Sequence, residues 1–287
     1  MTTSVEWCGL TLGAGHGEKT VSVEGWESLP PSRYDKVDRA RGHGTHRSRV
    51  YADERIVTVT GTTYSATDRD RRLLDLQQRM TFGEDEEPLT ITVAGRTLTA
   101  SAQLLRCDPV IATGSWNVGL IKWVAQWRCP DPLRYGPART TDPVKLPTSG
   151  SGLTYPLAYP LNYGPAGETG QLQLANAGTA PAPILFAVRG DLPGGTELSA
   201  AATGQRLTYA RPIPGQQLVE IDTAAGTVLV EGTSSRRAAL TSADWLHVPA
   251  RDRKTGKAGE LTVQFTSLSL VHGGTAQVTA TTQDTYW

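Results

Sequence analysis

Apolar and polar residues alternate along several short stretches of the first half of the chain, and this period of two predicts β-strands. The pattern is most regular near Cys129, where every second residue from Ile121 onward is apolar. Trp116, Trp123 and Trp127 fall in this region. We therefore expect a heavily packed strand, or one buried against a neighbouring subunit. The same alternation predicts strands over residues 5–12, 21–26, 55–61, 89–93 and 96–107, the last two joined by a hairpin turn.

A period of 3.6 residues is found in one stretch of the first half. Leu73, Leu76 and Met80 recur at helical spacing, and Gly83 follows as a terminator. The residues Thr67-Asp68-Arg69-Asp70 have the form of a capping box. The sequence therefore predicts one α-helix over residues 68–82.

A Pro-Asp-Pro sequence at residues 130–132 ends the aromatic strand. Proline cannot donate to a sheet ladder, and it pushes the preceding residue out of the helical region. Residues 136–165 then contain many prolines and glycines without periodicity. We therefore expect two domains, residues 1–137 and 166–287, joined by a linker over residues 138–165.

The second half shows recurring short strands with turn residues between them and no helical period. This pattern is typical of a β-sandwich. The strands are expected at residues 171–174, 182–189, 206–209, 217–222, 227–231, 261–270 and 277–281.

A polar segment, residues 30–54, interrupts the strands of the first half. It is too long and too poor in apolar residues to fold alone, so we expect an arm that orders on a partner. Aspartates interleave with its cations, which makes an acidic protein surface a better partner than DNA. Residues 84–87 of a neighbouring copy, Glu-Asp-Glu-Glu, are one candidate. The predicted intersubunit residues of the arm are Arg33, Arg39, Arg41, His43, His46, Arg47 and Arg49.

Composition and charge exclude several classes of protein. Charged residues make up 20% of the chain, which is unlike a disordered protein, and no apolar run has the roughly 20 residues that span a bilayer. Lysine and arginine balance aspartate and glutamate, which argues against binding nucleic acid by bulk charge. The N-terminal residues do not resemble a signal peptide. The three widely spaced cysteines are expected to be buried free thiols in a reducing compartment.

No motif predicts catalysis, a cofactor or a metal site. His43 and His46 lie in a polar segment without further ligands at a recognisable spacing. The glycines of residues 13–17 lack the spacing of a phosphate-binding loop, and no Gly-x-Ser-x-Gly elbow occurs. Carboxylates are scattered through the second half, where a solvated sheet face explains them. We therefore expect a protein that is not an enzyme.

The order of these features resembles a known family. Gly42-His43-Gly44 lies in the arm, Pro130-Asp131-Pro132 precedes Tyr135, and Asn176-Ala177-Gly178 opens the second half. Ile221-Asp222-Thr223 and a late Trp245-Leu246-His247-Val248-Pro249 segment follow in order. Together these pieces resemble the distal tail proteins of siphophages, and the likeness covers nearly the whole chain.

The resemblance implies a mainly β structural protein of the virion, at the distal end of a long non-contractile tail. An N-terminal β-rich domain with one helix and a hairpin would form a hexameric ring, and a galectin-like β-sandwich would stand outside it. The implied partners are the tail tube protein, the tail-tip hub protein, the tape measure protein and receptor-binding or side-fibre proteins. DNA would only pass through the lumen. The subunit would be made in the host bacterial cytoplasm, without membrane insertion.

This sequence departs from the simplest relatives in a basic loop at residues 251–260 and in its terminal aromatic pair. Trp245, Tyr286 and Trp287 are the predicted contacts of the outer domain with a partner. An alternative function is recognition of host-surface glycans by the sandwich, which would need an exposed aromatic ring in a shallow groove. Its candidate rings are Tyr155, Tyr159, Tyr163, Trp245 and Trp287. Core packing and anchoring of the linker explain the same aromatics.

Overall fold

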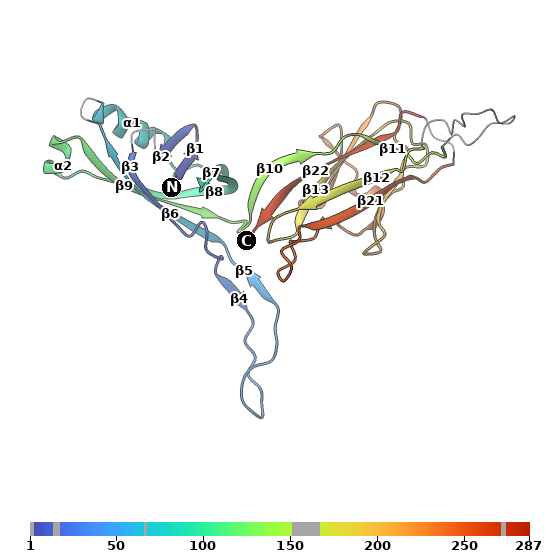
Figure 1. Cartoon of the computed structure of the whole chain (residues 1–287), viewed down its shortest axis with the longest axis horizontal. Helices are drawn as coiled ribbons and strands as arrows, with labels where there is room; N and C mark the ends of the chain where they lie inside the picture. Colours follow the sequence, from blue (N-terminus) through green and yellow to red (C-terminus); the bar gives the residue numbers. More distant parts are fainter. Residues whose placement is uncertain (1–2, 14–17, 66–67, 151–166, 271–273) are drawn as a thin grey trace, which may run out of the picture. The chain divides into compact units, whose positions relative to one another are not determined.

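The computed structural model of the chain describes residues 3–13, 18–65, 68–150, 167–270 and 274–287. The chain divides into two compact units, Met1–Gly136 with Trp287 and Pro137–Tyr286. Both are built mainly of antiparallel strands, so the prediction of a mainly β fold is confirmed (Figure 1).

Among the described residues of the first unit, nine strands and two helices lie wholly within it. They are β1 (Thr3–Trp7), β2 (Leu10–Gly13), β3 (Glu18–Glu24), β4 (Ser32–Tyr34), β5 (Val50–Ala52), β6 (Arg55–Tyr64), α1 (Arg69–Arg79), β7 (Glu87–Val93), β8 (Arg96–Val110), α2 (Thr113–Asn117) and β9 (Leu120–Cys129). The prediction of a single strand over residues 5–12 was wrong. These residues form the hairpin of β1 and β2, because Cys8 and Gly9 turn the chain with positive φ of 45° and 72°.

The long strand β8 takes part in two ladders of the first unit. Residues 96–102 of β8 pair with β7, and β7 pairs with β1. From Gln103 onward β8 pairs with β9, with a bulge between Leu104 and Arg106, which gives the order β3-β6-β9-β8. A bulge bends a strand and strengthens its twist, and this one lies just beyond the point where β8 changes partner.

The core of the first unit is built on the predicted face of β9. Trp123 and Trp127 are fully buried, and Trp127 packs edge-on against Trp7 with ring centroids 5.8 Å apart. Gly61 on β6 makes room for the ring of Trp123, since a Cβ there would lie 2.1 Å from it. Of the two alternatives predicted for the aromatic strand, the structure therefore shows the first: Trp123 and Trp127 are buried by residues of their own unit and not by a neighbouring subunit. Trp116 lies apart on the short helix α2, with the guanidinium of Arg69 over its ring.

Helix α1 is shorter than the predicted 68–82 and ends at Arg79, although Leu76 and Met80 are buried as the spacing required. Asp68 makes no side-chain cap, and Thr67 lies outside the described residues. Two of the three cysteines also differ from the prediction of buried thiols. Cys129 is buried, but Cys107 is half-buried and Cys8, in the β1–β2 turn, is exposed.

The second unit contains two sheets around one apolar core, as expected of a β-sandwich. One sheet has the order β18-β17-β16-β13-β22 with β11 on β22, and β20 also pairs with β13; the other has the order β12-β21-β14-β15-β19. The strands are β11 (Val144–Lys145), β12 (Gln171–Asn176), β13 (Ala182–Arg189), β14 (Thr196–Ala200), β15 (Gln205–Tyr209), β16 (Leu218–Asp222), β17 (Thr227–Val230), β18 (Ser234–Ser235), β19 (Leu240–Ala243), β20 (His247–Val248), β21 (Gly259–Ser267) and β22 (Gln277–Tyr286), with a 3-10 turn at Arg237–Ala239.

The predicted linker is partly wrong. Strand β10 (Arg134–Thr140) runs through its beginning, and the amide of Thr141 donates to the carbonyl of Ala280 on β22. Strand β11 also pairs with β22. Pro137 lies within β10 all the same, which is why the proline count misled the prediction. Residues 151–166, with Tyr155, Tyr159 and Tyr163, lie outside the described residues.

Candidate assembly interface

The polar segment of the first unit is a two-stranded ribbon, called the arm below (residues 31–53). Strands β4 and β5 pair at its base, in the register Arg33↔Tyr51. Farther out, the amide of His46 donates to the carbonyl of Val37 at 2.8 Å, and the amide of Arg39 donates to that of Gly44 at 3.2 Å. The turn beyond contains two glycines with positive φ. The predicted polar arm therefore has regular structure, which its lack of alternation concealed (Figure 1).

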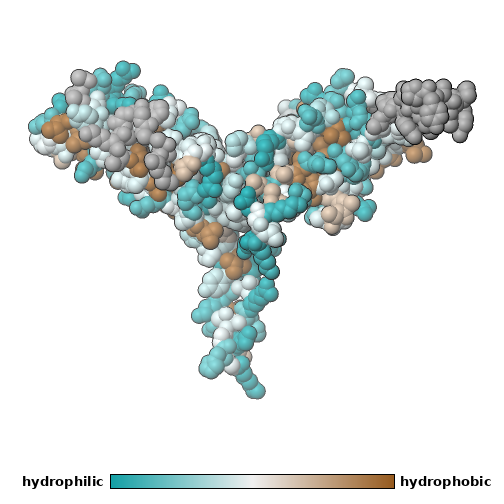
Figure 2. Space-filling view, in the orientation of Figure 1, coloured by the Kyte–Doolittle hydropathy of each residue, from teal (hydrophilic) through white to brown (hydrophobic). Residues whose placement is uncertain are grey.

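The arm exposes apolar side chains as well as charged ones. Tyr34, Val37, Val50 and Tyr51 are between 48% and 61% exposed. Figure 2 shows apolar positions interspersed along a mostly hydrophilic surface. An isolated two-stranded ribbon is only marginally stable in water. The arm therefore has the character of an element that docks on another surface.

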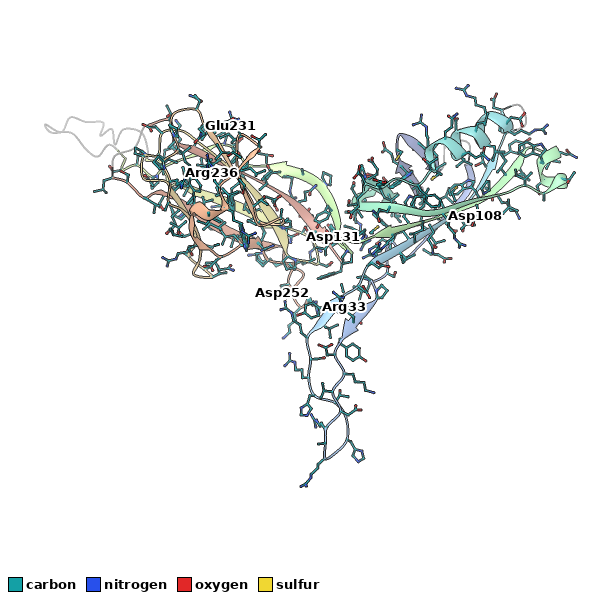
Figure 3. The ribbon with its side chains drawn as sticks, turned by 180° about the vertical axis from the view of Figure 1, so that it is seen from behind. Arg33, Asp108, Asp131, Glu231, Arg236 and Asp252 are labelled. Atoms are coloured by element: carbon teal, nitrogen blue, oxygen red, sulfur yellow. The ribbon has the colours of Figure 1, made fainter. Side chains whose placement is uncertain are left out.

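The predicted arm residues are all exposed. Arg33 lies on β4 (Figure 3), and the guanidinium of Arg49 lies 5.1 Å from the ring centroid of Tyr51. In the described part of the chain, no arginine of the arm forms an ion pair. From residue 33 to 49 the arm has six lysines and arginines against two aspartates. The structure thus presents a basic ribbon, with His43 in the turn and His46 beside it.

An acidic loop of the same unit offers complementary charge. Glu84, Asp85, Glu86 and Glu87 are exposed, and beside them Phe82 is 78% exposed. The hydroxyl of Ser101 donates to the carboxylate of Glu86 at 2.6 Å, which ties the loop to β8. The loop thus combines acidic side chains with an exposed aromatic ring.

The ladder β3-β6-β9-β8 has two open edges within the described residues. Strand β3 pairs with β6 alone, and residues 103–110 of β8 pair with β9 alone. Open edges can pair with strands of another chain. The sequence contained the alternating strands but no signal for which of them would be edges.

The outward face of this ladder is polar and close to neutral. Thr58, Thr60 and Thr62 occupy its centre on β6. Its charged side chains include two pairs, Arg128 with Glu54 at 2.5 Å and Arg106 with Asp108 at 3.7 Å. Paired charges neutralise one another, so this face attracts polyanions weakly.

The turn after β9 is held by one carboxylate. Asp131, labelled in Figure 3, accepts hydrogen bonds from the amide of Leu133 at 3.0 Å and the hydroxyl of Tyr135 at 2.6 Å. Burial, together with this hydrogen bond, raises the pKa of Tyr135 far above its ordinary value. The motif Pro-Asp-Pro-x-x-Tyr is therefore a turn-fixing device.

Sequence reasoning missed a cluster of charged side chains where the arm leaves the first unit. Arg55 and Arg134 are almost completely buried there, beside Glu27 and Trp26. A signal was present, since Arg55 is in phase with Val57 and Val59, which face inward on β6. A charged residue at an inward position requires partners.

The predicted contacts of the second domain lie in different places. Trp245 is partly buried against the core of the second unit, with the guanidinium of Arg237 5.6 Å from its ring centroid. Tyr286 is half-buried at the end of β22. Trp287 belongs to the first unit, where Arg134 donates a hydrogen bond to its main-chain oxygen.

The described residues contain no cluster of three or more metal-ligating side chains. Among the described helices, none has both the length and the apolar character needed to cross a bilayer. The geometry thus offers contact surfaces: an exposed ribbon, an acidic loop and open strand edges.

No protein-family model and no curated protein sequence matches this chain. Among solved structures, the fold is that of a hub protein from a phage adsorption apparatus. One matching structure is the SPP1 Dit protein, described as a paradigm of the hub adsorption apparatus in phages that infect Gram-positive bacteria. The TM-score is 0.67 at 15% identity, with 100% of both chains covered. The phage P2 baseplate, in its activated conformation with Ca, matches at a TM-score of 0.45 and 11% identity, over 98% of this chain and 97% of that one.

Proposed function

We propose that this protein is a structural distal tail protein of a long non-contractile phage tail. Six copies form a ring that joins the tail tube to the central hub and the adsorption apparatus. The observation that carries this proposal is the fold shared with a hub protein over the full length of both chains. The protein is no enzyme and needs no cofactor in this role. Its place is the distal end of the virion's tail, after synthesis in the host bacterial cytoplasm.

The first unit supplies the ring contacts in this proposal. A ring subunit needs two different surfaces that meet through rotation. The open edges of β3 and β8 are two such surfaces on one ladder. The basic arm and the acidic loop of residues 84–87 are a second complementary pair, so the arm acts as a clasp on a neighbouring copy.

The polar face of the ladder suits the lining of the lumen. A tube that conducts DNA must not hold it, and each phosphate contact made by a basic side chain adds affinity. The threonines of β6 and the paired charges beside them minimise such contacts. In this proposal DNA only passes through the lumen of the ring. The stable partners are the tail tube, hub, tape measure and receptor-binding or side-fibre proteins.

Mass photometry and negative-stain images of the purified chain test the ring. We expect hexamers, or stacked hexamers, whose fraction rises with concentration. Deleting residues 35–50 should leave monomers, because the clasp is removed. Shortening the exposed loop at residues 253–256 of the second unit is the matched control and should leave the rings intact. A chain that stays monomeric at high concentration, or rings unaffected by the arm deletion, would count against the proposal.

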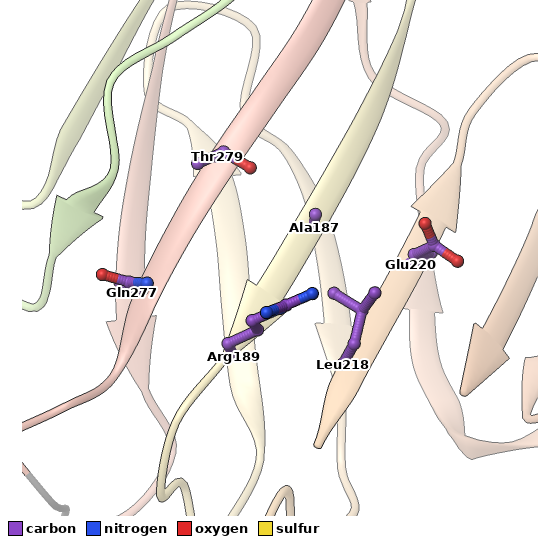
Figure 4. Close-up of a pocket in the computed structure, with 6 residues that line it drawn as sticks. All are labelled: Ala187, Arg189, Leu218, Glu220, Gln277 and Thr279. Carbon is purple, nitrogen blue, oxygen red and sulfur yellow. The ribbon is translucent and has the colours of Figure 1, made fainter. Parts of the chain in front are cut away.

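A second candidate function, glycan binding by the second unit, rests on one shallow hollow of about 350 Å³, although none of its lining residues is the aromatic ring that we expected. Ala187 lies at its centre, with Arg189, Glu220, Gln277 and Thr279 on the three strands around it (Figure 4). Sugar hydroxyls both donate and accept, so they match such a mixed set of groups. A glycan array should lose its signals with Ala187→Leu and keep them with Ala175→Leu on the opposite sheet. An array without signals would dispose of this candidate.

A further inference from the structure

One buried arginine ties together both ends of the arm. Arg55 lies two residues after the end of the arm and is 1% exposed. Its Nη1 donates to the carbonyls of Gly25 at 2.7 Å, Trp26 at 3.0 Å and Ser28 at 2.7 Å. These residues lie in the segment that leads into the arm. Its Nε donates to the carbonyl of Pro132 at 3.0 Å, in the turn after β9. One guanidinium on β6 thus holds two other segments of the chain, residues 25–28 and the turn after β9.

Burying the charge of Arg55 costs free energy, so side-chain packing alone does not explain why an arginine stands at this position. A buried charge loses its hydration, and an apolar side chain of similar volume would fill the space more favourably. Burial, and the like charge of Arg134, lower the pKa of Arg55 to about 10. The guanidinium does supply several donors in a fixed fork. The irregular segment of residues 25–28 has carbonyls that need such donors, because buried carbonyls are rarely left unpaired.

A second layer of contacts holds the same segment from another side. The guanidinium of Arg134 lies 5.6 Å from the ring centroid of Trp26, and its Nη1 lies 3.2 Å from the carboxylate of Glu27. Arg96 on β8 also pairs with Glu27, at 2.6 Å. Gly25 runs close against β6, since a Cβ there would lie 2.0 Å from the carbonyl oxygen of Ile56. We call Arg55, Arg134, Glu27 and Trp26 the arm root.

We propose that Arg55 is a positioning residue, which sets the direction in which the arm leaves the first unit and so allows the arm to reach a neighbouring copy. This inference rests on the proposed role of the arm in ring assembly. The arm itself has few contacts that could fix its direction. At about 3.3 Å per residue its tip lies roughly 35 Å from the root, so a tilt of about 10° at the root displaces the tip by about 6 Å. A displacement of that size would break side-chain contacts at the tip.

The test compares two variants of Arg55 with a stability-matched control in the full chain. Arg55→Lys keeps the charge but loses the fork, and Arg55→Met keeps the volume but loses every donor. Val59→Ala removes a buried side chain from the same strand without touching the root. Ring fraction is measured by mass photometry, thermal stability by calorimetry and amide exchange by mass spectrometry.

We expect both Arg55 variants to lower the ring fraction at least tenfold and to speed amide exchange in β4 and β5. Val59→Ala should keep its rings at an equal loss of thermal stability. Rings at the wild-type level in both Arg55 variants, or an equal loss of rings in Val59→Ala, would overturn the proposal. If neither Arg55 variant folds, the wild-type chain decides: the amide of Asp53, bonded to Pro31, must exchange more slowly than the amides of Arg39 and His46. Equal rates would refute a fixed root.

The two proposals fail in different ways. If deletion of residues 35–50 leaves the rings intact, the arm has no role in assembly and the proposed clasp is wrong. If that deletion abolishes the rings while the Arg55 variants keep them, the clasp stands and the positioning role of Arg55 is wrong.

Discussion

Individual polar residues in the motifs that carry the family resemblance fix turns and strand ends. The side chain of Asn176 is fully buried and uses both ends of its amide. Its Nδ2 donates to the carbonyls of Ala180 and Pro249, and its Oδ1 accepts from the amides of Gly178 and Thr285. The motif could be found in the sequence, but its partners could not, since Thr285 lies more than 100 residues away in the chain.

Asn176→Ala should therefore be strongly destabilising. The substitution leaves four backbone groups without their hydrogen-bond partner. Each group that stays buried costs about 1 kcal/mol or more, so we expect the free energy of unfolding to fall by about 2–4 kcal/mol. Urea denaturation followed by circular dichroism measures it. Gln173→Ala, at an exposed position of the same strand, should change stability by less than about 0.5 kcal/mol. Equal effects of the two substitutions would contradict this account of the motif.

Gly61 is a second single residue on which the fold depends. Gly61→Ala places a methyl group 2.1 Å from the ring of Trp123, which is buried and bonded through Nε1 to the hydroxyl of Thr63. Overpacking of this kind costs about 1–3 kcal/mol, and here the rigid ring sets the upper end. Denaturant melts and near-ultraviolet circular dichroism report it. Gly114→Ala, with open space around the added methyl group, is the matched control and should be neutral.

Strands and helices show where sequence patterns predict structure and where they do not. The alternation of apolar and polar residues in β9 predicted both the strand and its buried face. This was possible because successive side chains of a strand point to opposite faces, so the pattern along a single strand identifies the buried one. The dual role of β8 and the pairing of residues 134–145 were not predicted, since both depend on contacts far apart in the chain. The arm was located but its ribbon was missed, because no core imposes an alternating pattern on it.

Charge reversal tests the pairing of the arm with the acidic loop. Glu84→Lys with Asp85→Lys, or Arg41→Glu with Arg47→Glu, should each reduce the ring fraction about tenfold or more, since like charges then face one another. All four substitutions in one chain should restore the rings. Mass photometry at low and physiological salt measures this. Failure of the combined variant to recover would place the docking surface of the arm elsewhere.

The arm root should respond to pH through Glu27. Partial burial raises the pKa of this carboxyl, but the hydrogen bond from Arg96 and the charge of Arg134 outweigh it and hold the pKa below 4.5. A depressed pKa stabilises the fold above the unfolded value, and this contribution is lost as pH falls through the folded value. The stability difference between wild type and Glu27→Gln should be full at pH 7 and should close below about pH 4.5. A constant difference across this range would contradict the ion-pair account.

At the scale of the whole molecule, each unit has its own apolar core. The core of the second unit draws on residues from Leu146 to Ala280 and includes both of its sheets. The sequence predicted two domains, but it placed the last residue in the second one. Local patterns could not show otherwise, because the contact of Trp287 with Arg134 joins residues that are far apart in the chain.

The second unit should fold without the first. A chain of residues 137–286 keeps the complete core, so we expect a β-type circular dichroism spectrum and one cooperative unfolding transition. Calorimetry of this fragment beside the full chain measures it. A fragment that unfolds without cooperativity would show that the core needs the first unit.

The two crossings of the chain between its units have a mechanical consequence. The backbone leaves the first unit at Gly136 and returns at Trp287. Arg134 stands at the outgoing crossing and bonds the returning residue. The first crossing is a covalent connection, whereas at the second the chain is held to the first unit by non-covalent contacts of Trp287. Arg134 therefore links the hold on Trp287 to its own contacts with Trp26 and Glu27, so a pull on the last residue would reach the side chains from which the arm begins.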